Sequence, residues 1–407
     1  MKNIKNRALK YFLVFIIISF INDFWGAVIG NPTLNQIFLL FVIFRFKPLK
    51  ISVLKTRLKN IHLLLGFYII IIFLNSIISL GQYSSGITVF PTIIKLIIII
   101  YLSPYLKNIQ SSDFKYFTKY LFNSLFVLVF LPALFELFMN KNIMSYKGGI
   151  NPEIFFLRAF TIDKVDFAFN LIMLIGVSFV QYNKFKSVKK YFYLLVSIIS
   201  SSLLVFSFSS TNVLGLVLSV FLYLTFVSKK KIRTLFIVLS FGLISFFATQ
   251  NYHYIFVQKY LIQSYKVENT DEFRTAAAKE SYKLFLESPF FGHGAESNGY
   301  LLKDRLDFLY KPLSSHNILS EFTNFGLIGA IPILLVFFYV FQGVFKQRKN
   351  LSELGIIFII ISGPIITRLI FYFHRFDKSL YVIWILLGLI IIYNNANDFK
   401  LQNRNSS

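Results

Sequence analysis

A polar stretch from Gln250 to Ser315 carries many of the residues in this chain that could do chemistry. It holds Arg274, Lys279 and the turn Gly292-His293-Gly294, and it closes on Ser315-His316-Asn317. Guanidinium and ammonium groups bind phosphate through charge-assisted hydrogen bonds, and an imidazole titrates near neutral pH. An anionic, phosphate-bearing substrate requires such groups. Because the stretch lies between two hydrophobic spans, we interpret it as the active-site lid of an integral membrane enzyme.

The elements that must position these residues are hydrophobic helices. Hydrophobic residues make up 56% of the 407 residues and charged residues only 15%, whereas soluble domains are about 25% charged. Apolar runs that can cross a hydrocarbon core of roughly 30 Å recur along the chain. The sequence therefore predicts an all-α integral membrane protein with about twelve transmembrane helices. The predicted spans are 11–29, 34–46, 61–81, 87–106, 116–139, 165–182, 191–208, 211–227, 234–250, 316–345, 354–373 and 378–394.

The basic residues predict how these spans are oriented. The formal net charge is +24, which in a soluble protein would suggest nucleic acid. Here clusters such as Lys55–Lys59, Lys186–Lys190 and Lys229–Arg233 lie in alternate loops, as the positive-inside rule predicts. The rule places both termini in the cytoplasm and the loops 140–164 and 251–315 outside. We therefore expect the charge to orient helices among anionic lipids, with no nucleic acid as partner.

This orientation divides the chain into four parts. Residues 1–250 form helices one to nine with the outer loop 140–164, and residues 251–315 form a large extracytoplasmic loop between helices nine and ten. Residues 316–394 form helices ten to twelve, and residues 395–407 form a cytoplasmic tail. The first span is too long for a signal peptide and lacks a small-x-small cleavage site, which favours a retained anchor.

Metal sites and disulfides are not expected. The chain contains no cysteine, which excludes disulfide bonds and thiolate ligands. Its five histidines do not lie with carboxylates at the spacing of a metal site.

Within the large loop, the pattern predicts a helix from Glu272 to Leu286. Thr270 or Asp271 could cap its start, and Ala276 to Ala278 favour helix. Glu287-Ser288-Pro289 ends it. The next helix is predicted to begin near Ser314 or Ser315, so that His316 sits in its first turn at the outer surface.

Four segments together resemble the signature region of the O-antigen ligase and polymerase family (the Wzy/WaaL type). They are Arg274, the run Ser288-Pro289-Phe290-Phe291-Gly292-His293-Gly294, the pair His316-Asn317, and Gly326-Leu327-Ile328-Gly329 opening a span. The resemblance covers about residues 270–345 and extends in weaker form to Arg158. It implies glycosyl transfer outside the cytoplasm from an undecaprenyl-diphosphate-linked glycan, with no metal, nucleotide sugar or other cofactor.

Three positions depart from the family pattern. Tyr282 stands where members usually carry a tryptophan. Asn324 replaces the acidic residue expected just before the first glycine of Gly-x-x-Gly, and Glu321 lies one turn earlier. The segment Ser209-Ser210-Thr211 lacks the arginine of a Ser-Arg pair. The roles of Glu321 and of that middle span are therefore left open.

Residue chemistry and the resemblance together assign roles to four candidates. His316 is expected to be the general base for the acceptor hydroxyl. The alternative is that it is a residue at the start of a helix, hydrogen-bonded to its neighbours. Arg274 and Arg158 are expected to bind diphosphate. The alternatives are that Arg274 is ion-paired and that Arg158 anchors the chain at lipid headgroups. Arg368, inside span eleven, is the third diphosphate candidate, against a pair with an acid or an outward-reaching side chain.

A further buried charge, Lys95 in span four, has Asp23 or Glu136 as candidate partners, and we expect a structural pair there.

The favoured function is polymerisation of lipid-linked oligosaccharide repeat units into a surface polysaccharide, such as O antigen or capsule, at the bacterial inner membrane. The expected partners are the undecaprenyl-diphosphate-linked oligosaccharide, membrane lipid and a chain-length regulator protein. A ligase that moves the finished glycan to lipid A core or another acceptor uses the same donor, so this alternative stays open. A flippase or transporter of the same unit would favour two similar halves, which the sequence does not show.

Overall fold

All regular elements in the described residues are helices. The computed structural model describes residues 4–28, 34–46, 56–78, 86–107, 109–139, 159, 164–185, 187–207, 210–227, 275–295, 297–306, 318–347, 352–371 and 379–394. The α-helices are α1 (Arg7–Val28), α2 (Leu34–Arg45), α3 (Thr56–Ile78), α4 (Gly86–Leu102), α5 (Ser111–Leu125), α6 (Leu131–Met139), α7 (Lys164–Lys184), α8 (Lys189–Phe206), α9 (Ser210–Phe226), α11 (Ser297–Arg305), α12 (Leu319–Phe345), α13 (Glu353–Phe371) and α14 (Ser379–Tyr393). A further helix covers residues 275–287 and is called the loop helix below. A 3₁₀ turn (Ser103–Tyr105) follows α4, and a π-helical turn (Phe126–Phe130) joins α5 to α6.

The all-α architecture is confirmed over these residues, and each predicted span other than 234–250 overlaps a helix. The span 234–250 lies outside the described residues. Four stretches are long and apolar enough to cross a membrane: Lys59–Ile77, Ser112–Met139, Leu319–Phe345 and Glu353–Ile370. The chain is therefore a multi-pass membrane protein. The number twelve and the sidedness of the loops stay predictions.

Small residues let α9 and α13 approach closely. A Cβ atom on Gly363 would lie 2.1 Å from the carbonyl oxygen of Gly215. Ser219 donates to the Gly215 carbonyl at 2.7 Å and to the carbonyl of Ile360 on α13. Helices in lipid associate through such close packing and hydrogen bonds. This contact ties α9 to α13.

Polar contacts fasten the two terminal helices to the start of α5. The Asp113 carboxylate accepts the backbone N–H groups of Lys5 at 2.6 Å and Asn6 at 3.2 Å. Asn394, just after α14, accepts the N–H of Ile109 at 2.7 Å and donates to the carbonyl of Leu106 at 2.9 Å. The beginning of α1 and the end of α14 are thus held at the same side of the bundle.

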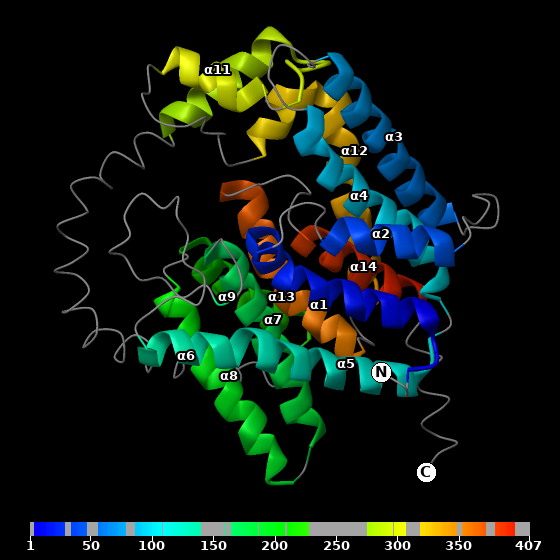
Figure 1. The fold of residues 1–407 in the computed structure, drawn as a ribbon, viewed down its shortest axis with the longest axis vertical. Coiled ribbons are helices and arrows are strands. Elements are labelled where there is room, and N and C mark those ends of the chain that lie inside the picture. The colour runs from blue at the N-terminus through cyan, green and yellow to red at the C-terminus, as the bar shows by residue number, and fades with distance from the viewer. Residues whose placement is uncertain are drawn as a thin grey trace, which may run out of the picture.

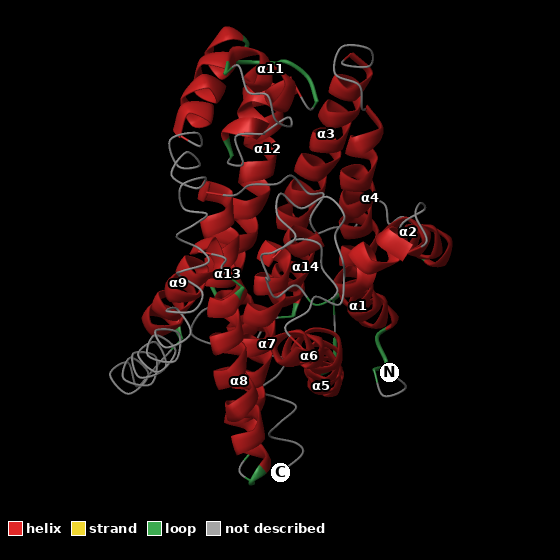
Figure 2. Cartoon of the chain, turned by 60° about the vertical axis from the view of Figure 1, so that its left-hand side comes forward, coloured by secondary structure: helices red, strands yellow, loops and turns green. Residues whose placement is uncertain are grey.

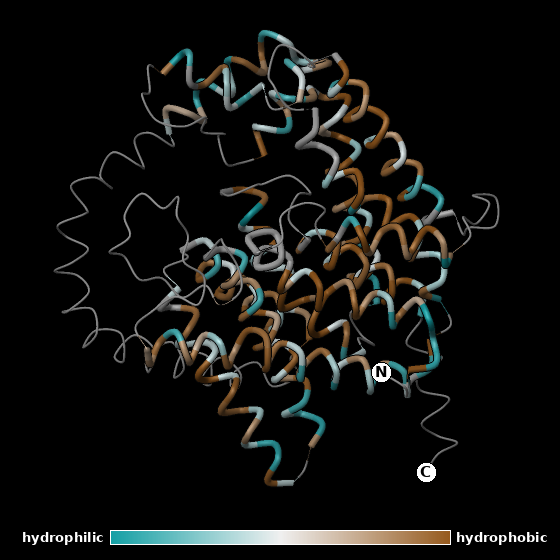
Figure 3. The backbone as a smooth tube through the Cα atoms, in the orientation of Figure 1, coloured by the Kyte–Doolittle hydropathy of each residue, from teal (hydrophilic) through white to brown (hydrophobic). Residues whose placement is uncertain are grey.

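The described part of the large loop lies at the other end of the molecule. Figures 1 and 2 both show α11 at the top, beside the upper end of α12 and away from the start of α1. Figure 3 shows α3 and α12 as mostly hydrophobic, whereas the loop helices mix polar and apolar residues. Residues 275–306 and the start of α1 therefore lie at different ends of the molecule.

Candidate functional site

Helix α12 is interrupted near its start, at Gly326. The backbone of Gly326 has φ 62° and ψ −165°, a conformation available essentially to glycine alone. A break of this kind removes helical hydrogen bonds on both sides, and buried backbone groups need replacement partners. The sequence motif Gly326-Leu327-Ile328-Gly329 therefore opens the long apolar part of α12 after a short polar segment.

The replacement partners come from the turn that follows the loop helix. The N–H groups of His293 and Gly294 donate to the carbonyls of Thr323 and Asn324 at 2.8 and 2.9 Å. In the other direction, the N–H groups of residues 327 and 328 donate to the carbonyls of residues 289 and 290 at 2.8 and 3.2 Å. We call this pair of segments, residues 289–294 and 323–328, the interlock.

Glycine is required on both sides of the interlock. A Cβ atom on Gly292, whose φ is 70°, would lie 2.5 Å from the backbone of Asn324. A Cβ atom on Gly326 would lie 2.2 Å from the carbonyl oxygen of Phe290. Both collisions are with backbone, which cannot rotate away as a flexible side chain can. The two glycine motifs noted in the sequence thus serve one contact.

Buried polar side chains extend the interlock to both loop helices. The Asn324 side-chain oxygen accepts the N–H of Asn298 at 2.9 Å and the hydroxyl of Ser297 at 3.1 Å. Asn298 donates to the Ser281 hydroxyl at 2.9 Å, and Thr323 donates to the Ser281 carbonyl at 3.0 Å. Asn324 thereby serves as an acceptor at the start of α11. An aspartate would present the same oxygen, so this departure from the family pattern preserves the chemistry.

His293 has a structural role in this arrangement. Its Nε2 lies 2.7 Å from the carbonyl oxygen of Leu284, near the end of the loop helix. Ser288 donates to the carbonyl of Gly292 at 2.9 Å and closes the turn. This hydrogen bond joins the turn to the end of the loop helix. The predicted end of the loop helix at Glu287-Ser288-Pro289 is confirmed.

An ion pair joins the two loop helices at their surface. Arg305 on α11 donates to both carboxylate oxygens of Glu287, at 2.6 and 2.7 Å. The hydrogen bond from Arg305 holds the pKa of Glu287 below its usual value. Together with the buried contact of Ala277, Leu284 and Leu302, this pair makes one unit of the loop helix and α11.

Glu321 is a fully buried acid at the start of α12, five residues before the break. Its carboxylate accepts the hydroxyl of Tyr68, from the middle of α3, at 2.9 Å, and both residues are 0% exposed. The Tyr68 ring also contacts the ring of Phe325 edge-on. An acid buried in an apolar bundle is costly and tends to be functional or paired. Sequence reasoning left the role of Glu321 open and did not identify Tyr68.

Arg368 is buried and ion-paired. Its guanidinium lies 3.0 Å from the carboxylate of Asp166 in the first turn of α7, and 5.7 Å from the ring centre of Phe169. Of the interpretations weighed from the sequence, pairing with an acid describes this contact. Binding of diphosphate by Arg368 stays a prediction, and Asp166 is a neighbour that the sequence did not identify.

A second buried acid holds the residue Ala159, which precedes α7 in the chain. The Glu136 carboxylate, 0% exposed, accepts the N–H of Ala159 at 2.9 Å. Ala159 has φ 49°, a left-handed conformation uncommon for residues other than glycine. Ala159 directly follows Arg158 in the sequence. Lys95 on α4, for which the sequence predicts a structural ion pair, is buried, with 5% of its surface exposed.

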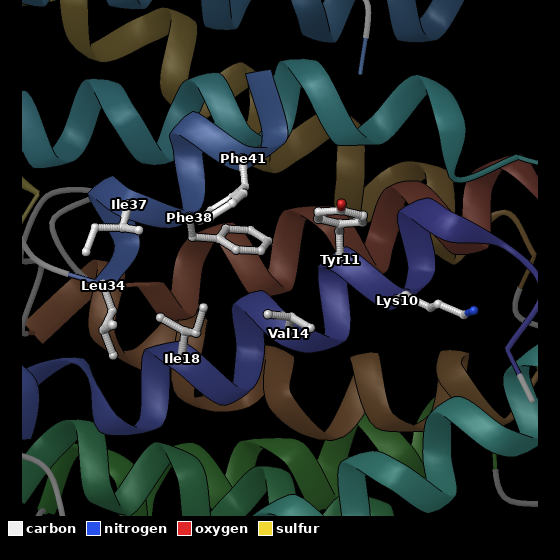
Figure 4. Close-up of a pocket in the computed structure, with 8 residues that line it drawn as sticks. All are labelled: Lys10, Tyr11, Val14, Ile18, Leu34, Ile37, Phe38 and Phe41. Atoms are coloured by element: carbon white, nitrogen blue, oxygen red, sulfur yellow. The ribbon is translucent and has the colours of Figure 1, made fainter. Parts of the chain in front are cut away.

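The groove between α1 and α2 differs from the interlock because its lining is mainly apolar. A groove of about 450 Å³ is lined by Val14, Ile18, Ile37, Phe38 and other side chains. Figure 4 shows these side chains on α1 and α2, with Lys10 at one end. Such a lining suits a lipid chain better than a reacting sugar or phosphate. The groove involves none of the residues predicted to act in catalysis.

Three of the predicted site residues, His316, Arg274 and Arg158, lie outside the described residues. Arg274 and His316 each lie close in the chain to an element that the interlock joins. Residue 275, after Arg274, begins the described part of the loop helix, and α12 begins at Leu319, three residues after His316. The predicted helix start near Ser314 or Ser315 also lies outside. Within the described residues, no group of three histidine or acidic side chains gathers as a metal site would require.

The comparisons with known proteins point to the same region. No curated protein matches the chain. Residues 195–334 match the model of the O-antigen ligase (Wzy_C) family, and this range contains α9, the loop helix, α11 and the complete interlock. The resemblance seen in the sequence is thereby confirmed over residues 195–334, which are similar to the O-antigen ligase family.

Proposed function

We propose that this protein polymerises undecaprenyl-diphosphate-linked oligosaccharide repeat units into a surface polysaccharide on the outer face of the bacterial cytoplasmic membrane. The family supports glycosyl transfer in polysaccharide synthesis. The observation that carries the proposal furthest is the interlock, which fixes the loop helix to the beginning of α12. Each of these two elements is preceded in the sequence by one of the two strongest candidate site residues: Arg274 precedes the loop helix and His316 precedes α12.

In the proposed reaction, a hydroxyl of one repeat unit attacks the anomeric carbon of another. The new glycosidic bond forms as the bond from that carbon to the diphosphate oxygen breaks. His316 takes the proton of the attacking hydroxyl, since an imidazole is a competent base near neutral pH. Arg274 and Arg158 bind the departing undecaprenyl diphosphate, and the planar guanidinium is suited to hold phosphate oxygens in pairs. Arg368 is a third candidate for the same anion and acts beside Asp166.

The alternative within the family is a ligase, which transfers the finished glycan to lipid A core or another acceptor. It uses the same donor and the same groups, and it differs in the acceptor that enters the site. We favour the polymerase because polymerases are the more divergent group within the family. A flippase is disfavoured because the matched family transfers glycans.

The test replaces His316 with alanine in the native host and examines surface glycan on gels. Loss of a general base costs about 10²- to 10⁴-fold in rate, so the ladder of repeat lengths should collapse to a single repeat. A matched control is His62→Gln. His62 is buried and lies 2.9 Å from the Ser103 hydroxyl, away from the proposed chemistry. This variant should keep the ladder at equal membrane levels.

The outcomes separate the candidate functions. An unchanged ladder in His316→Ala at normal protein level would remove His316 from catalysis. Loss of all surface glycan with accumulation of lipid-linked polymer would favour the ligase. A companion pair, Arg274→Lys and Arg274→Gln, tests diphosphate binding. If the paired geometry of the guanidinium matters, both variants lose activity, and lysine retains the larger share because it keeps the charge.

A further inference from the structure

Large apolar side chains are exposed beside the interlock. Leu286, in the last turn of the loop helix, is 55% exposed, and Phe290 and Phe291, in the turn that follows, are 61% and 68% exposed. Phe285 instead packs edge-on against Phe322 of α12. The apolar patch therefore lies on the side of the loop that does not face the bundle. In water such a patch would be costly, and exposed apolar patches of this kind mark interaction surfaces.

The backbone that presents this patch is fixed in place. Phe290 accepts the N–H of Ile328 through its carbonyl at 3.2 Å, and Gly292 cannot accept a side chain without colliding with Asn324. The position of Phe290 and Phe291 along the axis of α12, called their height, is therefore fixed.

That height coincides with the expected edge of the hydrocarbon. After the polar residues at its start, α12 is apolar from Phe325 to Phe345 apart from Gln342, and it is followed by Lys346. At 1.5 Å per residue this stretch rises about 30 Å, which matches the thickness of a bilayer core. Gly326 then lies at one boundary of the core, and the turn bonded beside it lies at the same boundary.

The exposed surface of α12 continues from this point into the membrane. Ile331, Leu335 and Phe338 are all exposed, and their spacing with Ile328 places the four residues on one face of the helix. Ile328, at the top of this stripe, is the residue whose N–H bonds to Phe290. The patch on the loop is therefore continuous in height with a stripe that faces lipid.

We propose that Leu286, Phe290 and Phe291 form an interfacial anchor that inserts into the leaflet at the Gly326 end of α12. Aromatic and apolar side chains at a membrane surface reach into the boundary between headgroups and acyl chains. The occupant of the surface is the phospholipid bilayer itself. Inserted in this way, the anchor holds the loop helix and α11 against the membrane surface. The inference uses α12 and the interlock alone, so it stands apart from the proposed reaction.

The absence of cysteine in the native chain makes a direct test straightforward. Single cysteines at Leu286, Phe290 and Phe291 are labelled with a nitroxide in the full-length protein, reconstituted in phospholipid nanodiscs. Collisions with oxygen, which concentrates in lipid, are compared with collisions with a water-soluble nickel chelate. Two control sites bracket the answer: Phe338→Cys on the lipid-facing stripe, and Asp304→Cys, which is exposed on α11.

The anchor predicts that labels at Phe290 and Phe291 collide with oxygen several-fold more than with nickel chelate, as at Phe338, and opposite to Asp304. Nickel access equal to that at Asp304 would overturn the proposal, because the patch would then face water. Protection from both reagents would also overturn it, since protein would cover the patch. Protection that appears only on adding undecaprenyl diphosphate would assign the surface to a polyprenyl chain instead.

A second measurement guards against an effect of the label. Phe291→Trp keeps an aromatic side chain, and lipids brominated near the top of the acyl chain should quench its fluorescence above the background of the two native tryptophans. Asp304→Trp should show no such quenching. Equal quenching at the two sites would contradict the anchor.

Discussion

Replacing Gly326 with alanine should open the interlock while the rest of the bundle stays folded. The added Cβ atom would lie 2.2 and 2.3 Å from the carbonyl oxygen and carbon of Phe290, and 2.6 Å from the nitrogen of Phe291. These contacts are with backbone, so one segment must move. Moving it breaks the four hydrogen bonds between residues 289–294 and 323–328.

The size of the effect follows from two contributions. A residue other than glycine at φ 62° and ψ −165° costs about 1–3 kcal/mol in backbone strain. The four hydrogen bonds contribute about 1 kcal/mol each, so the free energy of opening the interlock is roughly 4 kcal/mol. The backbone strain and the collision together offset most of this free energy. We expect the local opening free energy to fall by about 3 kcal/mol, which is roughly a 100-fold rise in the opening equilibrium.

Hydrogen exchange read by mass spectrometry measures this opening directly. Amides in 290–294 and 327–328 should exchange much faster in Gly326→Ala, whereas peptides from α13 keep their protection. The matched control is Gly66→Ala, because a Cβ atom at Gly66 on α3 meets no atom within 4 Å. Unchanged protection across the interlock in Gly326→Ala would refute the reasoning, and so would equal losses in both variants.

Three further predictions concern side chains around the same region. Asn324→Leu removes the acceptor for the start of α11, so it should lose about 1–3 kcal/mol and raise exchange in α11, whereas Asn324→Asp retains an acceptor oxygen and should raise exchange in α11 less. Removing one member of the Arg368–Asp166 pair should cost about 3–5 kcal/mol in thermal unfolding experiments, and Arg368→Gln with Asp166→Asn should recover part of it. Full glycan synthesis by that double variant would exclude diphosphate binding by Arg368. The pKa of Glu287 is lowered in the folded loop, so its pair with Arg305 stabilises above the unfolded carboxyl pKa and this contribution is lost as pH falls through the lower folded value. Exchange in α11 should therefore be faster in Arg305→Gln than in the native chain at neutral pH, and the two should converge in acid, whereas a difference that persists in acid would contradict this assignment.

The sequence predicted the helices well because hydrophobic runs and basic clusters are local signals. The predicted span 165–182 corresponds to α7 at Lys164–Lys184, and the stop at Pro289 ends the loop helix where expected. Apolar length decides such elements directly, since each must bury or face lipid along its own length.

The contacts that build the candidate site were not predictable in the same way. Nothing local to Gly326 indicates that its helix partners are replaced by a turn more than thirty residues earlier in the chain. The sequence foresaw an acid as one partner for Arg368, but Asp166 lies 202 residues away. Glu136 accepts the N–H of Ala159, a contact that no feature of the sequence indicated, while its pairing with Lys95 stays a prediction. Such pairings depend on how helices meet, which no single segment encodes.

The order of the two halves of the interlock along the chain bears on how the protein is made. Residues 289–294 leave the ribosome before residues 323–328, so the complement of the interrupted helix already exists when Gly326 is synthesised. The polar beginning of α12 can then enter the bilayer surface with its backbone N–H and C=O groups already hydrogen-bonded, as the apolar environment of a membrane requires. Folding of the loop before α12 and insertion of the tenth predicted span would in this way be completed together.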